Sequence, residues 1–422
     1  KQNPIQMKRN LILFSLWCTM SLSLFQCEGN DEPTPASTLN CVQNPDVCKL
    51  GEATNQFGFD IFKKLEADKP DDNLFISPLS ISSALSMTLN GANGKTKEEM
   101  LKVLGAGKIS LDELNQSYQT LLKELPNLDP KVKVDIANSI WYRQGFAVNP
   151  AFLNTNTTYY NSEVRPLDFS KPDAKDIINK WVSDKTNKLI PSIIDQIQDN
   201  SVMFLINAIY FKGTWRKQFD TKKTYDGDFT TEKNVQVPVK MMSYGNSLVK
   251  LSYFSNDKLH AVKLPYADSV YSMTVILPKE GFAVKDILPE LTLTNWNSWN
   301  KAYSAEEIFF ALPKFSLRYE NSLNASLEAL GMPTAFIPGQ ADFSGIATGQ
   351  ELSISNVKHK AFIEVDEAGT KAAAATSVEI VVTSVPNNPQ FIVNRPFIFV
   401  ISESRTNQAI FIGKMMNPTN DK

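Results

Sequence analysis

The stretch Glu367–Ser384, EAGTKAAAATSVEIVVTS, combines two preferences that rarely share one segment. Four consecutive alanines, Ala372–Ala375, favour a helix, because Ala has the highest helix propensity. They lead directly into a series rich in β-branched residues, Val378–Thr383, which favours a strand. The stretch is therefore interpreted as a segment of small residues that can become a strand.

The two faces of this strand would differ in polarity, because alternate residues of a strand point to opposite sides. Both charged residues after Gly369, Lys371 and Glu379, fall on the odd-numbered side. A shift by one residue would bury these charges, which is unfavourable unless they are paired. We expect the even-numbered side to enter a packed sheet, although an ordinary edge strand with one solvated face fits the same pattern. That side comprises Thr370, Ala372, Ala374, Thr376, Val378, Ile380 and Val382.

The overall composition is that of an ordinary globular chain. Of 422 residues, 42% are hydrophobic and 21% are charged, and the net charge is −2. Without a global excess of basic residues, the sequence gives no reason to expect nucleic acid as a partner.

The N-terminal residues differ in kind from the rest. A basic start at Met7 is followed by the apolar run LILFSLWCTMSLSLF, which predicts a secretory signal too short for a membrane span. The tetrad Leu24–Cys27 resembles a bacterial lipobox, with Gln26 where a small residue is usual, and the acidic, proline-rich EGNDEPTP resembles the tether of surface lipoproteins in Bacteroidetes-type bacteria. We expect a signal peptide at 1–26, a polar tether at 27–50 and a globular domain at 51–422. Lipidation of Cys27 would place the chain at the outer membrane; the alternative is plain secretion after cleavage nearby.

All four cysteines lie within the first 48 residues. Cys18 leaves with the signal, and Cys41 and Cys48 can close a small disulfide loop in an oxidising compartment. The body of the chain therefore has no cysteine nucleophile and no thiolate metal site, and we expect neither a metal nor a cofactor.

The body alternates helical and strand-like patterns without a repeat or a long linker. NQFGFDIFKKLEA has helical spacing, and NLFISPLSISSALSMTLNGANGKTKEEMLKVLG is interpreted as a short strand followed by two helices. VKVDIANSIWYRQ and SVMFLINAIYFKGTW indicate buried strands, and HAVKLPYADSVYSMTVILPKEG indicates two. EEIFFALPKFSLRYENSLNASLEALG is interpreted as one strand and a helix, and the C-terminal PFIFVISESRTNQAIFIGKMMNP as a hairpin. These elements predict one large α+β domain.

Signals for catalysis are weak. The stretch Gly91–Thr96 superficially resembles a phosphate loop, but Leu89 stands where the first glycine is required. Only two histidines are present, and His359 lies in the strand-like NVKHKAFIEV, where a hydrogen-bonded buried histidine is expected. A hydrolase that pairs His359 with a serine and a carboxylate is the alternative. We expect no enzyme.

Across residues 55–418 the chain resembles a serpin. The blocks that carry the resemblance follow the family order: NLFISPLSISSALSMTLNGANGKTKEEMLKVLG, FLINAIYFKGTW, LPYADSVYSMTVILPKEG, ALPKFSL, ADFSGI, VKHKAFIEVDEAGTKAAAAT, NRPFIFVI and AIFIGKMMNP.

The resemblance implies a fold and a mechanism. It implies a five-stranded central sheet, two further sheets, eight or nine helices, and a reactive loop at about 367–394 that baits a target serine protease. Cleavage of the loop would insert it into the central sheet and trap the protease covalently, with the inhibitor acting as a monomer. By the family's spacing from Gly369, the scissile bond is Thr383–Ser384, or alternatively Val382–Thr383. Such a bond suits elastase-like or subtilisin-like enzymes, with papain-like cysteine proteases as a further class. The absence of Lys and Arg between Lys371 and Arg395 argues against a trypsin-like target.

The resemblance also assigns supporting roles. The intact alanine run favours an inhibitor over the alternative, a non-inhibitory serpin that acts as a binding or carrier protein, and Lys371 stands where the family commonly has Glu. The hinge comprises Glu367, Gly369, Thr370, Ala372, Ala373, Ala374, Ala375 and Thr376; the shutter, a buried polar network under the central strands, comprises Ser77, Ser80, Asn207 and His359; and the breach, where the loop first enters, comprises Trp215, Lys314 and Glu367. A Lys314–Glu367 ion pair is expected to tether the hinge.

Overall fold

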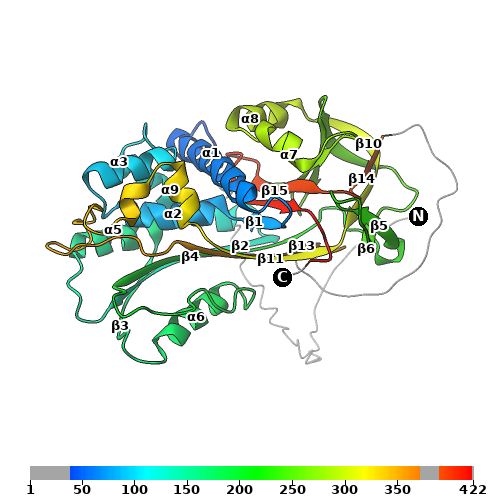
Figure 1. Ribbon diagram of the computed structural model, residues 1–422. Coiled ribbons are helices and arrows are strands. Elements are labelled where there is room, and N and C mark those ends of the chain that lie inside the picture. The colour runs from blue at the N-terminus through cyan, green and yellow to red at the C-terminus, as the bar shows by residue number, and fades with distance from the viewer. Residues whose placement is uncertain (1–38, 371–388, 421–422) are drawn as a thin grey trace, which may run out of the picture. The chain divides into compact units, whose positions relative to one another are not determined.

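A computed structural model of the protein describes residues 39–370 and 389–420 (Figure 1). The expected signal peptide, Cys27, the hinge beyond Thr370 and both alternatives for the scissile bond lie outside the described residues.

Nine α-helices occur in the described part of the chain. Two of them begin at residues that the sequence marks as caps: the Ser77 hydroxyl accepts from the Ser80 N–H ahead of Pro78, and Ser110 forms a capping box with Glu113. The helices are α1 (Pro45–Asp68), α2 (Pro78–Leu89), α3 (Gly94–Val103), α4 (Leu111–Glu124), α5 (Pro150–Tyr160), α6 (Ala174–Lys185), α7 (Val284–Ile287), α8 (Leu293–Ala302) and α9 (Asn324–Leu330).

The described strands form two sheets. The six-stranded sheet has the order β11 (Phe315–Ser322), β12 (Lys358–Val365), β13 (Gly369–Thr370), β4 (Met203–Thr214), β2 (Val132–Arg143) and β3 (Glu163–Leu167). The ten-stranded sheet has the order β1 (Leu74–Ile76), β16 (Ala409–Met415), β15 (Phe397–Glu403), β9 (Tyr271–Pro278), β8 (Leu259–Pro265), β7 (Val249–Ser255), β10 (Ser304–Pro313), β6 (Gln236–Ser243) and β5 (Tyr225–Thr230), and β14 (Gln390–Ile392) pairs with β10.

Two details of the strand predictions require correction. The two smaller sheets that were expected are joined, because the first half of β10 pairs with β7 and its last three residues pair with β6. The segment expected to hold one strand before α9 holds two, β10 and β11, with a break at Pro313 and Lys314. Proline lacks the N–H that a ladder needs, so the chain changes sheets there.

The boundary of the tether also requires correction. The expected tether ran to residue 50, but α1 begins at Pro45, and Val47 and Leu50 are buried against the core. These side chains continue the apolar face of α1, so they belong to the globular part. A disulfide joins Cys41 to Cys48 at the start of this helix.

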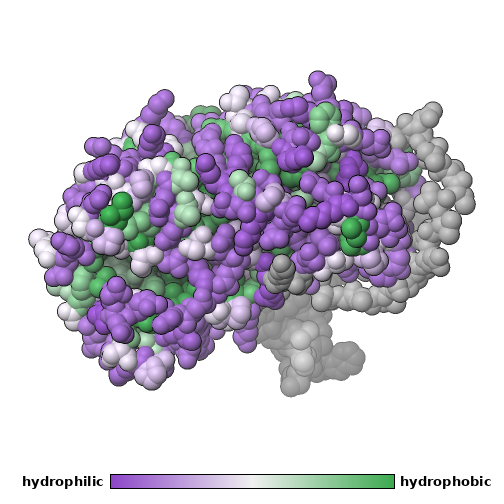
Figure 2. Space-filling model, viewed as in Figure 1, coloured by the Kyte–Doolittle hydropathy of each residue, from purple (hydrophilic) through white to green (hydrophobic). Residues whose placement is uncertain are grey.

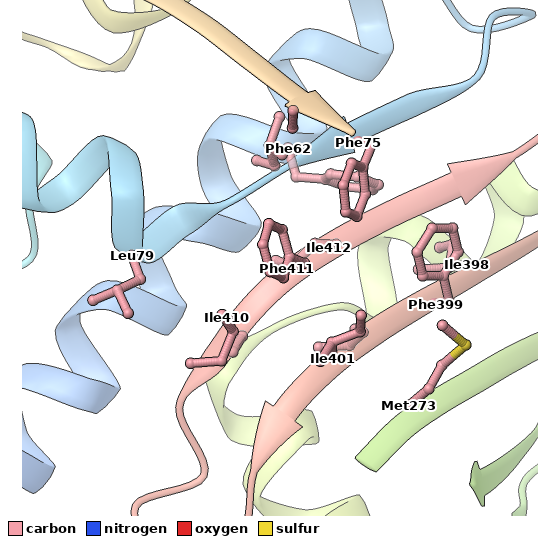
Figure 3. Packing of buried hydrophobic residues seen from close by; sticks show 14 of the residues in the cluster. Phe62, Phe75, Leu79, Met273, Ile398, Phe399, Ile401, Ile410, Phe411 and Ile412 are labelled. Atoms are coloured by element: carbon pink, nitrogen blue, oxygen red, sulfur yellow. The ribbon is translucent and has the colours of Figure 1, made fainter. Parts of the chain in front are cut away.

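The six-stranded sheet has helices on both faces, with α1 and α2 on one side and α6 on the other (Figure 1). On the first side, Phe75 of β1 stacks on Phe411 of β16, with ring centroids 5.1 Å apart, at the centre of the main core (Figure 3). On the other side, a smaller core joins α6 to β2 through Trp181 and Trp141. The face of the molecule in Figure 2 is mostly hydrophilic, with small separate apolar patches.

Candidate functional site: the hinge and the slot in the sheet

The hinge begins as a short strand inside the six-stranded sheet. After β12 the chain turns within four residues, and the Asp366 side chain accepts from the N–H groups of Ala368 and Gly369. Thr370 then pairs with Val365 of β12 on one side and with Gly213 of β4 on the other. The first two residues of the putative insertion strand are therefore seated between two strands that they separate.

Gly369 allows the hinge to approach β4 closely. A Cβ atom at this position would lie 2.1 Å from the Gly213 carbonyl oxygen and 2.7 Å from the Thr214 Cα. Both neighbours are backbone atoms of a paired strand, which cannot move aside cheaply. Only glycine fits here while β13 remains in the sheet.

The three residues of the expected breach lie around the turn. The Lys314 Nζ and the Glu367 Oε2 are 2.7 Å apart, and the Thr224 hydroxyl donates to the other carboxylate oxygen at 2.7 Å. The Trp215 indole N–H donates to the Asp366 carbonyl at 2.9 Å. Burial alone raises the pKa of Glu367, but the hydrogen bonds from Lys314 and Thr224 and the lysine charge hold that pKa below its ordinary value. The ion pair therefore tethers the turn at neutral pH.

Thr370 faces the interior, as the alternation in the sequence predicts. Its side chain is 4% exposed, and its hydroxyl lies 2.6 Å from the Tyr266 hydroxyl in a hydrogen bond. Tyr266 in turn stacks on Trp215, with ring centroids 4.5 Å apart. The hinge residue thus sits in a pocket that accepts a small polar side chain and has no room or partner for a charge.

Beyond Thr370 the two flanking strands are separate. Among the described residues no ladder joins β4 to β12; each pairs with β13 at one end only. A narrow cavity of about 20 Å³ lies between them, bordered by residues 209–211 of β4 and 360–363 of β12, with Thr370 at its end. It has room for about one water molecule. This slot, bounded by β4 and β12 and continuous with β13, is where a longer strand would extend.

The structure brings three of the four expected shutter residues together. The His359 Nε2 accepts from the Ser77 N–H at 3.2 Å, the Ser77 hydroxyl donates to the Ile410 carbonyl at 2.8 Å, and the Ser80 N–H donates to the Ser77 hydroxyl at 3.2 Å. Asn207 is elsewhere: its amide donates to the Asn138 Oδ1 at 2.8 Å. The Asn207 Oδ1 is buried and has no hydrogen-bond partner among the described residues.

His359 is a structural residue in this arrangement. It is 5% exposed, and burial lowers its pKa to about 4, so the imidazole is neutral at pH 7. Its Nε2 is already an acceptor for a backbone N–H, and the Ser77 hydroxyl already donates to a carbonyl. A buried, neutral histidine with this partner gives no support to the hydrolase alternative.

Sequence reasoning missed several contacts of the site. Thr224, Tyr266 and Asn138 hold Glu367, Thr370 and Asn207, respectively. Each comes from a segment that is distant along the chain, so no local pattern announces it. The paired aromatic residues Trp215 and Tyr266 left one usable signal, since each directly follows a strand-like run.

Two searches of residues 39–370 and 389–420 gave negative results. No group of three or more His, Cys, Asp or Glu side chains is arranged to hold a metal ion. No helix in these ranges has the length and apolar character that a membrane span requires.

Comparison with known proteins identifies the family. The family description "Serpin (serine protease inhibitor)" matches residues 52–418. The leukocyte elastase inhibitor of Xenopus laevis is 34% identical over 378 residues, which cover 87% of this chain and 99% of that protein.

Solved structures agree with this match. The thermophilic serpin tengpin in its native state superimposes with a TM-score of 0.78 at 37% identity, covering 87% of this chain and 94% of that chain. A thyroxine-binding globulin in complex with thyroxine has a TM-score of 0.80 at 29% identity, covering 88% of this chain and all of that chain. The chain belongs to the serpin family and has the α+β fold of that family.

Proposed function

We propose that the protein inhibits serine proteases as a suicide substrate, by inserting its cleaved reactive loop into the slot between β4 and β12. One observation carries the proposal: Gly369 and Thr370 already pair with both flanking strands, and these strands have no ladder to each other among the described residues. Extending β13 along the slot would satisfy the free edges of both strands, which is a favourable exchange.

The chemistry divides between the protease and the inhibitor. The protease serine attacks the carbonyl carbon of Thr383, the bond to Ser384 breaks, and the new amino terminus takes up the proton. An ester then joins Thr383 to the protease. Insertion of the loop carries this ester away from the loop's original position before water hydrolyses it. Val382–Thr383 is the alternative bond, and the steps are the same.

The specificity proposed is for enzymes with small or shallow apolar primary pockets. Residues 381–385, VVTSV, offer only small or β-branched side chains on both sides of the bond. Elastase-like and subtilisin-like proteases accept such residues, and papain-like cysteine proteases form a further class. The leukocyte elastase inhibitor among the relatives supports the first of these classes.

A denaturing gel tests the proposal. The protein is mixed with elastase at equimolar concentration, boiled in detergent and separated. A band at the summed mass of protease and inhibitor, absent when the protease serine has been blocked beforehand, is the expected result. Clean cleavage in the loop without this band, for every small-pocket protease tried, would contradict the proposal.

A carrier function is the second candidate. The likeness to a thyroxine-binding globulin supports it, because that relative binds a small ligand and shares the fold. The alanine run Ala372–Ala375 favours inhibition, since small side chains enter a sheet with few clashes. A cleaved protein that neither traps protease nor gains thermal stability is the outcome expected of a carrier.

We also propose that the chain is exported, anchored by lipid on Cys27, and active as a monomer. The support is the basic and apolar run from Met7 and the tetrad Leu24–Cys27. Expression in a bacterial host with radiolabelled palmitate should label the wild-type chain but not Cys27→Ser. Equal labelling of both would contradict the anchor, and a soluble, processed wild-type chain would favour plain secretion.

A further inference from the structure

The segment that follows α6 crosses the slot. This segment, residues 186–195, is called the strap. Three of its residues, Thr186, Leu189 and Ile190, line the cavity between β4 and β12. Core residues such as Phe75 and Phe411 line the same cavity from the other face of the sheet. The strap therefore covers the place where the proposed new strand would lie.

One part of the strap is fixed to α6. The side-chain oxygen of Asn179, on α6, accepts from the N–H groups of Ile193 and Ile194 at 2.8 Å each, and its amide donates to the Ile194 carbonyl at 2.8 Å. The helix is itself packed on β2, where the Trp141 and Trp181 rings are 6.3 Å apart. This anchor belongs to the half of the sheet that contains β4.

The end of the strap is fixed to the other half of the sheet. Asp195 forms ion pairs with Lys358 and with Lys360 of β12, the latter at 3.5 Å. Glu320 of β11 pairs with the same two lysines, at 2.6 Å and 3.0 Å. The two lysine side chains are only 19% and 10% exposed, so each needs a carboxylate. Asp195 and Glu320 supply them, and Asp195 does so from the strap.

Insertion of a strand would pull these two anchors apart. A new strand between β4 and β12 widens the sheet by about 4.8 Å, the spacing of neighbouring strands. An ion pair at 3 Å does not survive that displacement unless the strap moves with it. On its outer side the strap borders an open hollow of about 690 Å³, which Lys175, Lys180 and Asp184 of α6 also line. The strap has room to lift there.

We propose that the cluster of Asp195, Lys358, Lys360 and Glu320 is a salt-sensitive latch that holds the strap across the slot and limits the rate of loop insertion. The proposal rests on the proposed function, because a latch needs an insertion to restrain. Asp195 is 63% exposed, so salt screens its attraction to the lysines. Release of the latch should therefore quicken with ionic strength.

The test compares Asp195→Asn with two matched variants. Asp195→Glu keeps the charge. Asp184→Asn removes an equally exposed type of ion pair, that between Lys180 and Asp184 at 2.7 Å, which lies within α6 and does not span the slot. Each full-length protein is cut in the reactive loop by elastase at saturating concentration. Insertion is then followed by tryptophan fluorescence and by resistance to urea.

Loss of the latch should show as a rate. We expect Asp195→Asn to insert about five-fold faster than wild type at low salt, the factor that corresponds to one exposed ion pair of about 1 kcal/mol. Raising NaCl to about 0.5 M should accelerate wild type, Asp195→Glu and Asp184→Asn but leave Asp195→Asn nearly unchanged.

The outcomes separate the two proposals. Equal insertion rates for Asp195→Asn and Asp184→Asn, or an unchanged salt dependence in Asp195→Asn, would overturn the latch and leave the inhibitory mechanism intact. A wild-type chain that is cut in the loop without any change in fluorescence or urea resistance would contradict loop insertion, and with it both proposals.

Discussion

Replacement of Thr370 by arginine should turn the inhibitor into a substrate. Thr370 is 4% exposed and lies between Val365 and Gly213, with its hydroxyl 2.6 Å from that of Tyr266. An arginine at this position would place a guanidinium group in the sheet without a carboxylate partner. The loop could still be cut, but it could no longer enter the slot in time.

The size of the effect follows from the burial. An unpaired charge in such a site costs roughly 3–5 kcal/mol, and each 1.4 kcal/mol is a factor of about ten. The seated hinge should therefore become less populated by at least about a hundred-fold. Thr370→Ser keeps the hydroxyl and the small volume, so it serves as the matched control and should behave as wild type.

The assay is the stoichiometry of inhibition with elastase, read together with the denaturing gel. Wild type and Thr370→Ser should give mainly covalent complex, and Thr370→Arg should give mainly cleaved chain with active protease. Circular dichroism of the uncut variant should show the wild-type fold. A Thr370→Arg variant that still inhibits at the wild-type stoichiometry would refute the inward assignment of this residue.

Three further predictions concern stability. Lys314→Met leaves the Glu367 carboxylate, 8% exposed, without its cation, and should lower the free energy of unfolding by about 1–3 kcal/mol; an unchanged urea midpoint would contradict the tether. The folded-state pKa of His359, about 4, lies below the ordinary 6.5, so the unfolded chain binds more protons in between: stability should be complete above pH 6.5 and fall by about 3 kcal/mol as the pH drops to 4, a loss that urea titrations should find absent in His359→Gln. Replacing Cys41 and Cys48 by serine opens a short loop, with a sequence separation of 7, and should cost about 2–3 kcal/mol by calorimetry; a melting temperature equal to wild type would count against a structural role for the disulfide.

Much of the site was predictable because its information is local. The alternation from Thr370 onward placed that residue inward, and the structure buries it. Ser77 could be recognised as a cap because Pro78 follows it at the start of an apolar helix. The ion pair of Lys314 and Glu367 came from the family resemblance, since 53 positions separate the two residues.

The parts that escaped prediction depend on packing between distant segments. Asn207 was expected beside His359, but in this structure it bonds to Asn138, its direct neighbour across β2 and β4. The partner of a buried amide is set by strand register, which one sequence pattern does not reveal. The tether was drawn too long, because the charged and polar residues near Cys48 masked a helix whose apolar face already includes Val47 and Leu50.

The strap shows the same limit on a larger scale. Its residues 186–195, TNKLIPSIID, read as an unremarkable loop with a proline. The alternating Lys358 and Lys360 read as the solvated face of a strand. Only the fold brings Asp195 over both lysines and gives the loop a position across the slot.

Thermal unfolding before and after cleavage of the reactive loop tests the central claim most directly. Insertion would bury Val378, Ile380 and Val382 at roughly 1.5–3 kcal/mol each and add a ladder of hydrogen bonds to both β4 and β12. The cut protein should therefore melt at least about 10 °C higher than the intact protein. A cut protein that melts at the same temperature as the intact chain, or below it, would contradict loop insertion into the slot.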